Sequence, residues 1–120
     1  MICIWDGGSL TVCDSAEEAI SGSDVIYADT FQSYHIPKDQ QEARLEALMP
    51  YQVNSKMMSL ANPKAIFMHC LPASRDVEVS TDVIDGPQSV IFDQAENRMH
   101  AQKALMAYLL WFEDHVAIRK

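Results

Sequence analysis

Two short apolar runs in this sequence each end in a cluster of polar side chains that could do chemistry. Residues 65–68 lead into residues 69–73 (His-Cys-Leu-Pro-Ala), and residues 89–92 lead into residues 93–98 (Asp-Gln-Ala-Glu-Asn-Arg). Short apolar runs bounded by turn residues are typical of buried strands in a parallel sheet. Since ligands bind beyond the carboxyl ends of such strands, we expect both clusters to lie at one edge of a sheet.

Cys70 and Arg98 are the side chains best suited to bind a ligand. Cys70 has a polarizable thiol beside the imidazole of His69, and Arg98 has a planar fork of donors suited to phosphate or carboxyl oxygens. Each also has a plain structural interpretation. A single cysteine after a strand is often a small buried hydrophobe, and residues 96–98 could merely open a helix.

The first third of the chain predicts a strand, a helix and a second strand. Residues 10–13 alternate and are rich in β-branched side chains, residues 15–20 look like a capped helix, and Gly22 is its stop. Residues 24–27 form the next apolar run, which ends near Asp29. This β-α-β order is the signature of a right-handed crossover in a parallel sheet.

Three further helices are predicted downstream. Residues 38–49 have helical spacing after Pro37, residues 54–60 follow a capping asparagine, and residues 96–112 form the longest apolar stripe. Together with the strands, this order predicts a three-layer α/β unit with a mostly parallel sheet of about four strands.

Composition limits the possible partners and surroundings. The 120 residues fit one domain, and a formal charge of −8 disfavours binding to nucleic acid or an anionic membrane. The three cysteines have no metal-ligand spacing, so we expect a reduced, cytoplasmic protein without a metal site. No stretch approaches the length of a membrane span, and no leader pattern opens the sequence.

Several strings in this sequence closely resemble the carboxyl-terminal part of the ornithine carbamoyltransferase family. They are His-Cys-Leu-Pro-Ala at 69–73, Gly-Pro-Gln-Ser at 86–89, Phe-Asp-Gln-Ala-Glu-Asn-Arg at 92–98 and His-Ala-Gln-Lys-Ala at 100–104. The resemblance extends back through residues 24–31 and 49–54, so it covers nearly all of this chain but only part of the family's chain.

The resemblance implies a reaction and a set of site residues. In this family the neutral side-chain amine of ornithine attacks carbamoyl phosphate, giving citrulline and phosphate without any cofactor. By position, Asp29, Ser33 and Tyr34 would bind ornithine. Cys70 and Leu71 would contact the carbamoyl group and the amine, and Arg98 would hold carbamoyl phosphate. Cys70 and Arg98 are thus the expected catalytic residues.

One loop departs from the family pattern. The family has methionine and glycine after the loop serine, whereas this sequence has Tyr34 and His35 after Ser33. Histidine adopts the backbone angles open to glycine only at a cost, and a tyrosine ring is more rigid than a thioether. The loop therefore predicts either a retuned pocket for the amine substrate or drift in a chain no longer selected for catalysis.

The resemblance also shows which parts of the family's chain do not occur here. The Ser-Thr-Arg-Thr-Arg and His-Pro-x-Gln strings of the amino-terminal carbamoyl-phosphate domain are absent, as is the Asn-Asn strand that opens the ornithine domain. We expect residues 1–120 to be a partial ornithine-binding domain with an incomplete Rossmann-like fold, inactive alone. It would act with a separate amino-terminal half or as a homo-oligomer. The alternative is a non-catalytic interaction module or remnant that binds a full-length relative.

Overall fold

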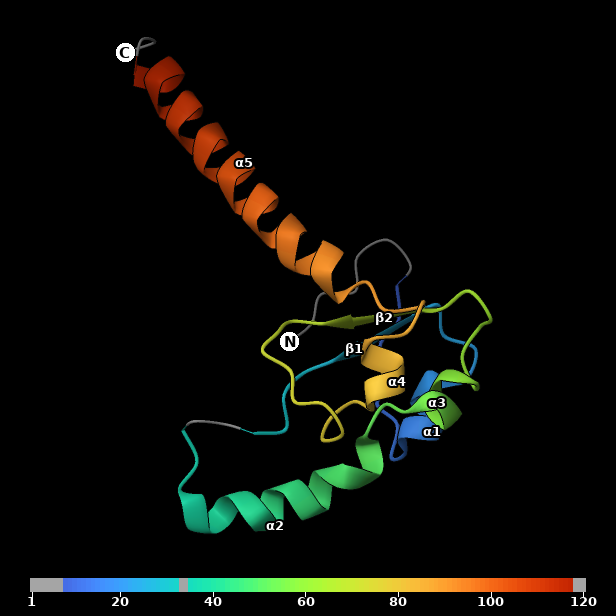
Figure 1. Cartoon of the computed structure of the whole chain (residues 1–120). Coiled ribbons are helices and arrows are strands. Elements are labelled where there is room, and N and C mark those ends of the chain that lie inside the picture. The colour runs from blue at the N-terminus through green and yellow to red at the C-terminus, as the bar shows by residue number, and fades with distance from the viewer. Residues whose placement is uncertain (1–7, 33–34, 118–120) are drawn as a thin grey trace.

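The computed structural model describes residues 8–32 and 35–117, which form an α/β arrangement around a parallel sheet (Figure 1). Its strands are β1 (Val25–Ala28) and β2 (Ile66–His69). Its helices are α1 (Ala16–Ile20), α2 (Lys38–Leu48), the 3-10 turn η1 (Met49–Tyr51), α3 (Ser55–Met58), α4 (Thr81–Ile84) and α5 (Ile91–Ala117).

The parallel pairing of β1 and β2 confirms the expected direction of the sheet. Val25 pairs with Ile66 at one end, and Ala28 pairs with His69 at the other. The two strands therefore end level with each other. Whatever follows Ala28 and His69 in the chain begins at the same edge, as parallel geometry requires.

The predicted strand at residues 89–92 is wrong, because the backbone there turns into a helix. Ser89 forms a single parallel bridge to Phe67, and the Val90 N–H donates to the Phe67 carbonyl over 3.0 Å. The next bond belongs to the helix, since the Gln94 N–H donates to the Val90 carbonyl over 2.9 Å. Helix α5 thus begins at Ile91, five residues before the expected start at 96.

The predicted strand at residues 10–13 is also wrong. This segment is irregular, and Val12 is 87% exposed. Alternating, β-branched residues form a strand only when a neighbouring strand accepts their hydrogen bonds and covers one face. Within residues 8–32 and 35–117 the sheet has two strands, so the expected count of about four is not reached.

The short helices begin at the predicted capping residues. Ser15 accepts the Glu18 N–H at the start of α1, and Asn54 accepts the Met57 N–H over 3.1 Å at the start of α3. Gly22 ends the α1 turn with a φ of +69°, an angle that glycine adopts without steric cost. Helix α2 spans the range predicted for it to within one residue.

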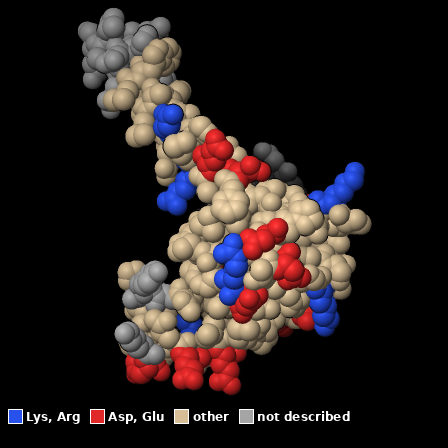
Figure 2. All heavy atoms as spheres, in the orientation of Figure 1, with Lys and Arg blue, Asp and Glu red and all other residues tan. Residues whose placement is uncertain are grey.

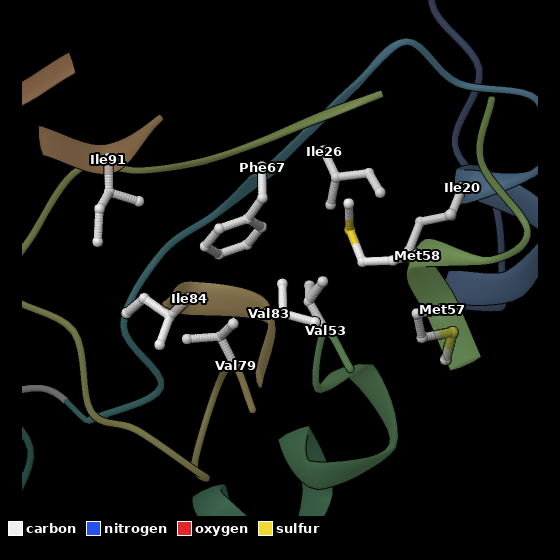
Figure 3. Packing of buried hydrophobic residues seen from close by; sticks show 10 residues of the cluster. All are labelled: Ile20, Ile26, Val53, Met57, Met58, Phe67, Val79, Val83, Ile84 and Ile91. Atoms are coloured by element: carbon white, nitrogen blue, oxygen red, sulfur yellow. The ribbon is translucent and has the colours of Figure 1, made fainter. Parts of the chain in front are cut away.

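A compact apolar core lies under the sheet and holds β2 in place. Phe67 is fully buried, and side chains from β1, α3, α4 and the first turn of α5 converge around it (Figure 3). The core side chains are Ile20, Ile26, Val53, Met57, Met58, Phe67, Val79, Val83, Ile84 and Ile91. Because Phe67 lies near the middle of β2, packing around it fixes the strand that leads to His69 and Cys70.

Helix α5 projects from this body as a long rod (Figure 1). Ile91 is buried in the core, whereas the side chains from Ala95 to Trp111 are all exposed. No helix in the described part of the chain is both long and apolar enough to cross a membrane.

Candidate functional site

Asp29 and Cys70 meet at the level ends of the two strands. Each follows its strand directly, and the Cys70 thiol donates a hydrogen bond to the Asp29 carboxylate over 3.0 Å between Sγ and Oδ1. The sequence predicted both residues as site residues and predicted that they would share one edge of a sheet. The structure brings them together there.

The Cys70–Asp29 hydrogen bond shifts the pKa of both groups in opposite directions. It is the main reason that the pKa of the Cys70 thiol is raised, and partial burial adds to the effect. The same bond lowers the pKa of the Asp29 carboxyl, helped by the Thr30 N–H that donates to it over 2.7 Å. At neutral pH the pair is therefore a protonated thiol beside a carboxylate, which can orient an amine but has little thiolate character.

Arg98 supplies the positive charge of this edge. It lies on α5 with an exposed side chain, and its charge partly offsets the raised pKa of the Cys70 thiol. The guanidinium thus lies close enough to the thiol for its field to act there. An exposed arginine beside an uncharged thiol suits an anionic ligand with oxygen acceptors.

The backbone after Cys70 has an unusual course. Leu71 has a φ of +54°, a left-handed angle that is uncommon for a residue other than glycine, and the Leu71–Pro72 peptide bond is cis. The Leu71 N–H is held by a hydrogen bond to Nδ1 of His69 over 2.9 Å. The imidazole thereby fixes the turn that presents Cys70 and Leu71 at the edge.

His69 and Glu78 form a buried pair beneath this turn. Their exposed fractions are 1% and 0%, and Nε2 of His69 lies 3.7 Å from Oε1 of Glu78. Because Nδ1 of His69 accepts a hydrogen bond, the proton of the neutral ring resides on Nε2, facing Glu78. The Ser74 N–H also donates to Glu78, so the carboxylate ties the loop after Pro72 to the histidine.

Glu78 and Gln94 are site residues that sequence reasoning missed. Gln94 Oε1 accepts the His69 N–H over 3.0 Å, and Gln94 Nε2 donates to the Tyr27 hydroxyl over 2.9 Å. Gln94 lies in the polar cluster 93–98 that the sequence predicted at this edge, but nothing in the sequence singles it out as the residue that bonds to His69 and Tyr27. The one signal for Glu78 is a carboxylate placed between two valines, where a loop would leave it in water.

Space for a ligand borders Asp29. A groove of about 550 Å³ runs along β1 toward α1 and η1, with Val25, Asp29, Arg44 and Tyr51 among its lining. Arg44 spans the loop after Asp29 by donating to the Phe31 carbonyl over 3.0 Å. The predicted ornithine contacts Ser33 and Tyr34 lie outside the described residues.

Charges on the molecular surface agree with a local rather than a general anion site. Figure 2 shows acidic side chains gathered along one border of the molecule, where α2 presents Asp39, Glu42 and Glu46. Basic side chains are spread singly over the rest of this face and do not form a continuous stripe. Arg98 therefore acts as a local positive charge that lowers the pKa of Cys70 and not as part of an extended positive field on this face.

Comparison with known proteins gives one consistent family. Residues 2–109 match the family model described as aspartate/ornithine carbamoyltransferase, Asp/Orn binding domain. The ornithine carbamoyltransferase of Methanothermobacter thermautotrophicus is 53% identical over 104 residues, which are 87% of this chain and 34% of that protein. That of Rhodopseudomonas palustris is 55% identical over 104 residues, 87% of this chain and 33% of that protein.

Solved structures agree with the sequence match. The ornithine carbamoyltransferase of Pyrococcus furiosus superposes with a TM-score of 0.71 at 46% identity, over 78% of this chain and 29% of that chain. An N-acetyl-L-ornithine transcarbamylase gives 0.73 at 36% identity, over 86% of this chain and 32% of that chain. This chain spans about a third of the length of these relatives. It belongs to the aspartate/ornithine carbamoyltransferase family and corresponds to part of that family's Asp/Orn binding domain.

Proposed function

We propose that this chain provides the amine-substrate side of an ornithine carbamoyltransferase, which forms citrulline and phosphate from ornithine and carbamoyl phosphate. The observation that carries this proposal is the hydrogen bond between Cys70 and Asp29 at the level ends of β1 and β2. It gives a carboxylate and an uncharged thiol side by side, which suits a substrate that arrives as a cation and reacts as a neutral amine.

In this proposal, ornithine and carbamoyl phosphate are bound by different residues. Asp29 holds the amino-acid end of ornithine together with Ser33 and Tyr34. Cys70 and the backbone of Leu71 contact the carbamoyl group and the attacking amine. Arg98 binds the phosphate oxygens of carbamoyl phosphate, for which its planar fork of donors is suited.

The chemistry depends on positioning and charge. The amine nitrogen forms a bond to the carbamoyl carbon, and the resulting tetrahedral intermediate carries negative charge on its oxygen. The carbon–oxygen bond to phosphate then breaks, phosphate leaves with that electron pair, and the amine nitrogen loses a proton. Arg98 stabilises the growing charge on the phosphate, whereas the protonated thiol of Cys70 orients the amine without forming a covalent bond.

We further propose that the chain alone has no appreciable carbamoyl transfer. The relatives are about three times as long, and the phosphate-loop strings of the family are not in this sequence. In the same view the two strands belong to a larger Rossmann-like sheet, of which β1 is an outer strand here. When several acting groups are removed together, little stabilisation of the transition state remains.

The proposed setting is the cytoplasm, and the proposed partner is an amino-terminal carbamoyl-phosphate domain or further copies of the chain. Cys13 and Cys70 are both free, in line with a reducing compartment. The second candidate function is a non-catalytic module that binds a full-length relative. The exposed apolar side chains of α5, among them Leu105, Leu109 and Trp111, favour that alternative.

The test is citrulline formation by the purified chain, alone and mixed with a separately produced carbamoyl-phosphate domain of a relative, with Arg98→Ala as the control. We expect activity only in the mixture and loss of it in the control. Activity of the chain alone would contradict the proposed dependence on the other domain. A mixture that forms a complex but no citrulline would favour the interaction module. Running the mixture with N-acetylornithine as well tests the amine specificity of the loop with Tyr34.

A further inference from the structure

One amide group joins the start of α5 to the ends of both strands. Gln94 accepts the His69 N–H at the end of β2 and donates to the Tyr27 hydroxyl on β1, over 3.0 and 2.9 Å. The hydrogen bond to the His69 N–H is partly buried, whereas the one to the Tyr27 hydroxyl is exposed. Both halves of the amide are used, so its orientation is fixed.

Gln94 contributes the side-chain hydrogen bonds that join the first turn of α5 to both strands. Ile91 is 2% exposed and anchors the helix in the core, but apolar packing is not directional. From Ala95 to Trp111 every side chain is exposed, and Figure 1 shows the helix leaving the body of the molecule. Ile91 thus anchors the start of α5 in the core, and the hydrogen bonds of Gln94 fix the orientation of the helix about that anchor.

Arg98 stands one helical turn beyond Gln94 and on the same face, because residues i and i+4 are neighbours on a helix. We propose that Gln94 is a positioning residue for the carbamoyl-transfer site, which orients Arg98 at the edge where Cys70 lies by locking α5 to the ends of β1 and β2. The role in carbamoyl transfer rests on the proposed function. The link from the strand ends through Gln94 to Arg98 stands on the geometry of this chain.

The Cys70 thiol can report where Arg98 lies. Three charged or titratable groups surround it: Asp29 bonds to it and raises its pKa, Arg98 lowers that pKa, and His69 acts on the Asp29 carboxyl. If α5 rotates away, the thiol loses the field of Arg98 and keeps that of Asp29. The pKa of Cys70 should then rise.

Three substitutions separate positioning from general damage. Gln94→Met keeps the side-chain length but removes both hydrogen bonds. Gln94→Glu keeps an acceptor for the His69 N–H and can accept the Tyr27 hydroxyl proton, so it should restore the bridge. Gln88→Met is the matched control, because Gln88 donates to the Ala65 carbonyl over 2.8 Å at the opposite end of β2.

The experiment measures the pH dependence of Cys70 alkylation by iodoacetamide in chains carrying Cys3→Ser and Cys13→Ser. Arg98→Ala should slow alkylation roughly two- to fivefold below the midpoint, the size of change that one nearby unit charge produces in water. It should do so equally in the Gln88→Met background. In the Gln94→Met background Arg98→Ala should have no further effect, and Gln94→Glu should restore the effect.

An equal response to Arg98→Ala in the parent and in Gln94→Met would overturn the proposal. Circular dichroism checks folding. If Gln94→Met does not fold, Tyr27→Phe replaces it, because that substitution removes only one of the two hydrogen bonds. Tyr27→Phe should weaken the response to Arg98→Ala, and a full response would count against the bridge. In the mixture with the carbamoyl-phosphate domain, Gln94→Met should raise KM for carbamoyl phosphate. If no variant forms citrulline, the proposed function fails, while the thiol measurement still decides the role of Gln94.

Discussion

At the scale of single residues, the bond between Asp29 and Cys70 makes a prediction about pH. Asp29→Asn weakens the hydrogen bond that chiefly raises the pKa of the thiol and removes the negative charge that adds to it, so that pKa should fall and alkylation at neutral pH should speed up. The rate of Cys70 alkylation by iodoacetamide, measured as a function of pH, checks this. The chain used has Cys70 as its only cysteine. Asp14→Asn, at an exposed carboxyl in the irregular segment, is the control and should leave the rates unchanged. An unchanged midpoint in Asp29→Asn would contradict the assignment of the raised pKa to the Asp29 carboxylate.

The buried carboxylate of Glu78 makes a second prediction, on stability. Glu78→Ala leaves the Ser74 N–H and the His69 ring without their partner in the interior, and an unsatisfied buried group costs about 1–3 kcal/mol. Glu78→Gln should cost less, since its carbonyl still accepts a hydrogen bond. Urea unfolding measures both against Glu46→Ala on the exposed face of α2. Equal midpoints for Glu78→Ala and Glu46→Ala would rule out a structural role for the pair.

At the scale of elements, the capping of α3 is the clearest case of a local rule acting on the core. Asn54 accepts the Met57 N–H, and α3 then buries Met57 and Met58. Asn54→Ala should lower the free energy of unfolding by about 1 kcal/mol, whereas Asn54→Asp should retain most of the cap. Thermal unfolding compares them with Asn97→Ala on exposed α5, which should have little effect. A larger loss for Asn97→Ala would contradict this assignment.

Local sequence patterns correctly predicted elements that are marked by capping residues or apolar runs. They failed where contacts with distant residues determine whether a segment is a strand or a helix. The caps Ser15 and Asn54, the parallel strands and the meeting of Asp29 with Cys70 all follow from residue type and order. Residues 89–92 were predicted as a strand because their apolar run fits a buried strand as well as a buried helix start. The structure decides for the helix from Ile91, whose side chain enters the core.

At the scale of the whole molecule, the partners of the strand ends could not be predicted because they come from distant parts of the chain. Glu78 reaches His69 across nine positions, and Gln94 reaches Tyr27 across 67. Neither separation follows a helical or strand period, so only the folded arrangement identifies these pairings, although the cluster that contains Gln94 was expected at this edge. The same holds for residues 10–13, whose pattern suits a strand but which have no neighbouring strand in the described structure.

The division of the molecule into a packed body and a projecting α5 gives the last prediction. Among the side chains of α5 that the structure describes, up to Trp111, only Ile91 enters the core and Gln94 forms the bridge. A chain ending after His100 keeps both. Its free energy of unfolding, measured with urea, should change by no more than is typical of surface substitutions, about 0.5 kcal/mol. Helical circular dichroism should fall because most of α5 is removed. A matched chain that ends after Val90 loses Ile91 as well and should unfold at clearly lower urea, since truncating a buried isoleucine costs about 2–5 kcal/mol. If the chain ending after His100 unfolds as readily as the one ending after Val90, the outer part of α5 must contribute stability through contacts beyond Ile91 and Gln94.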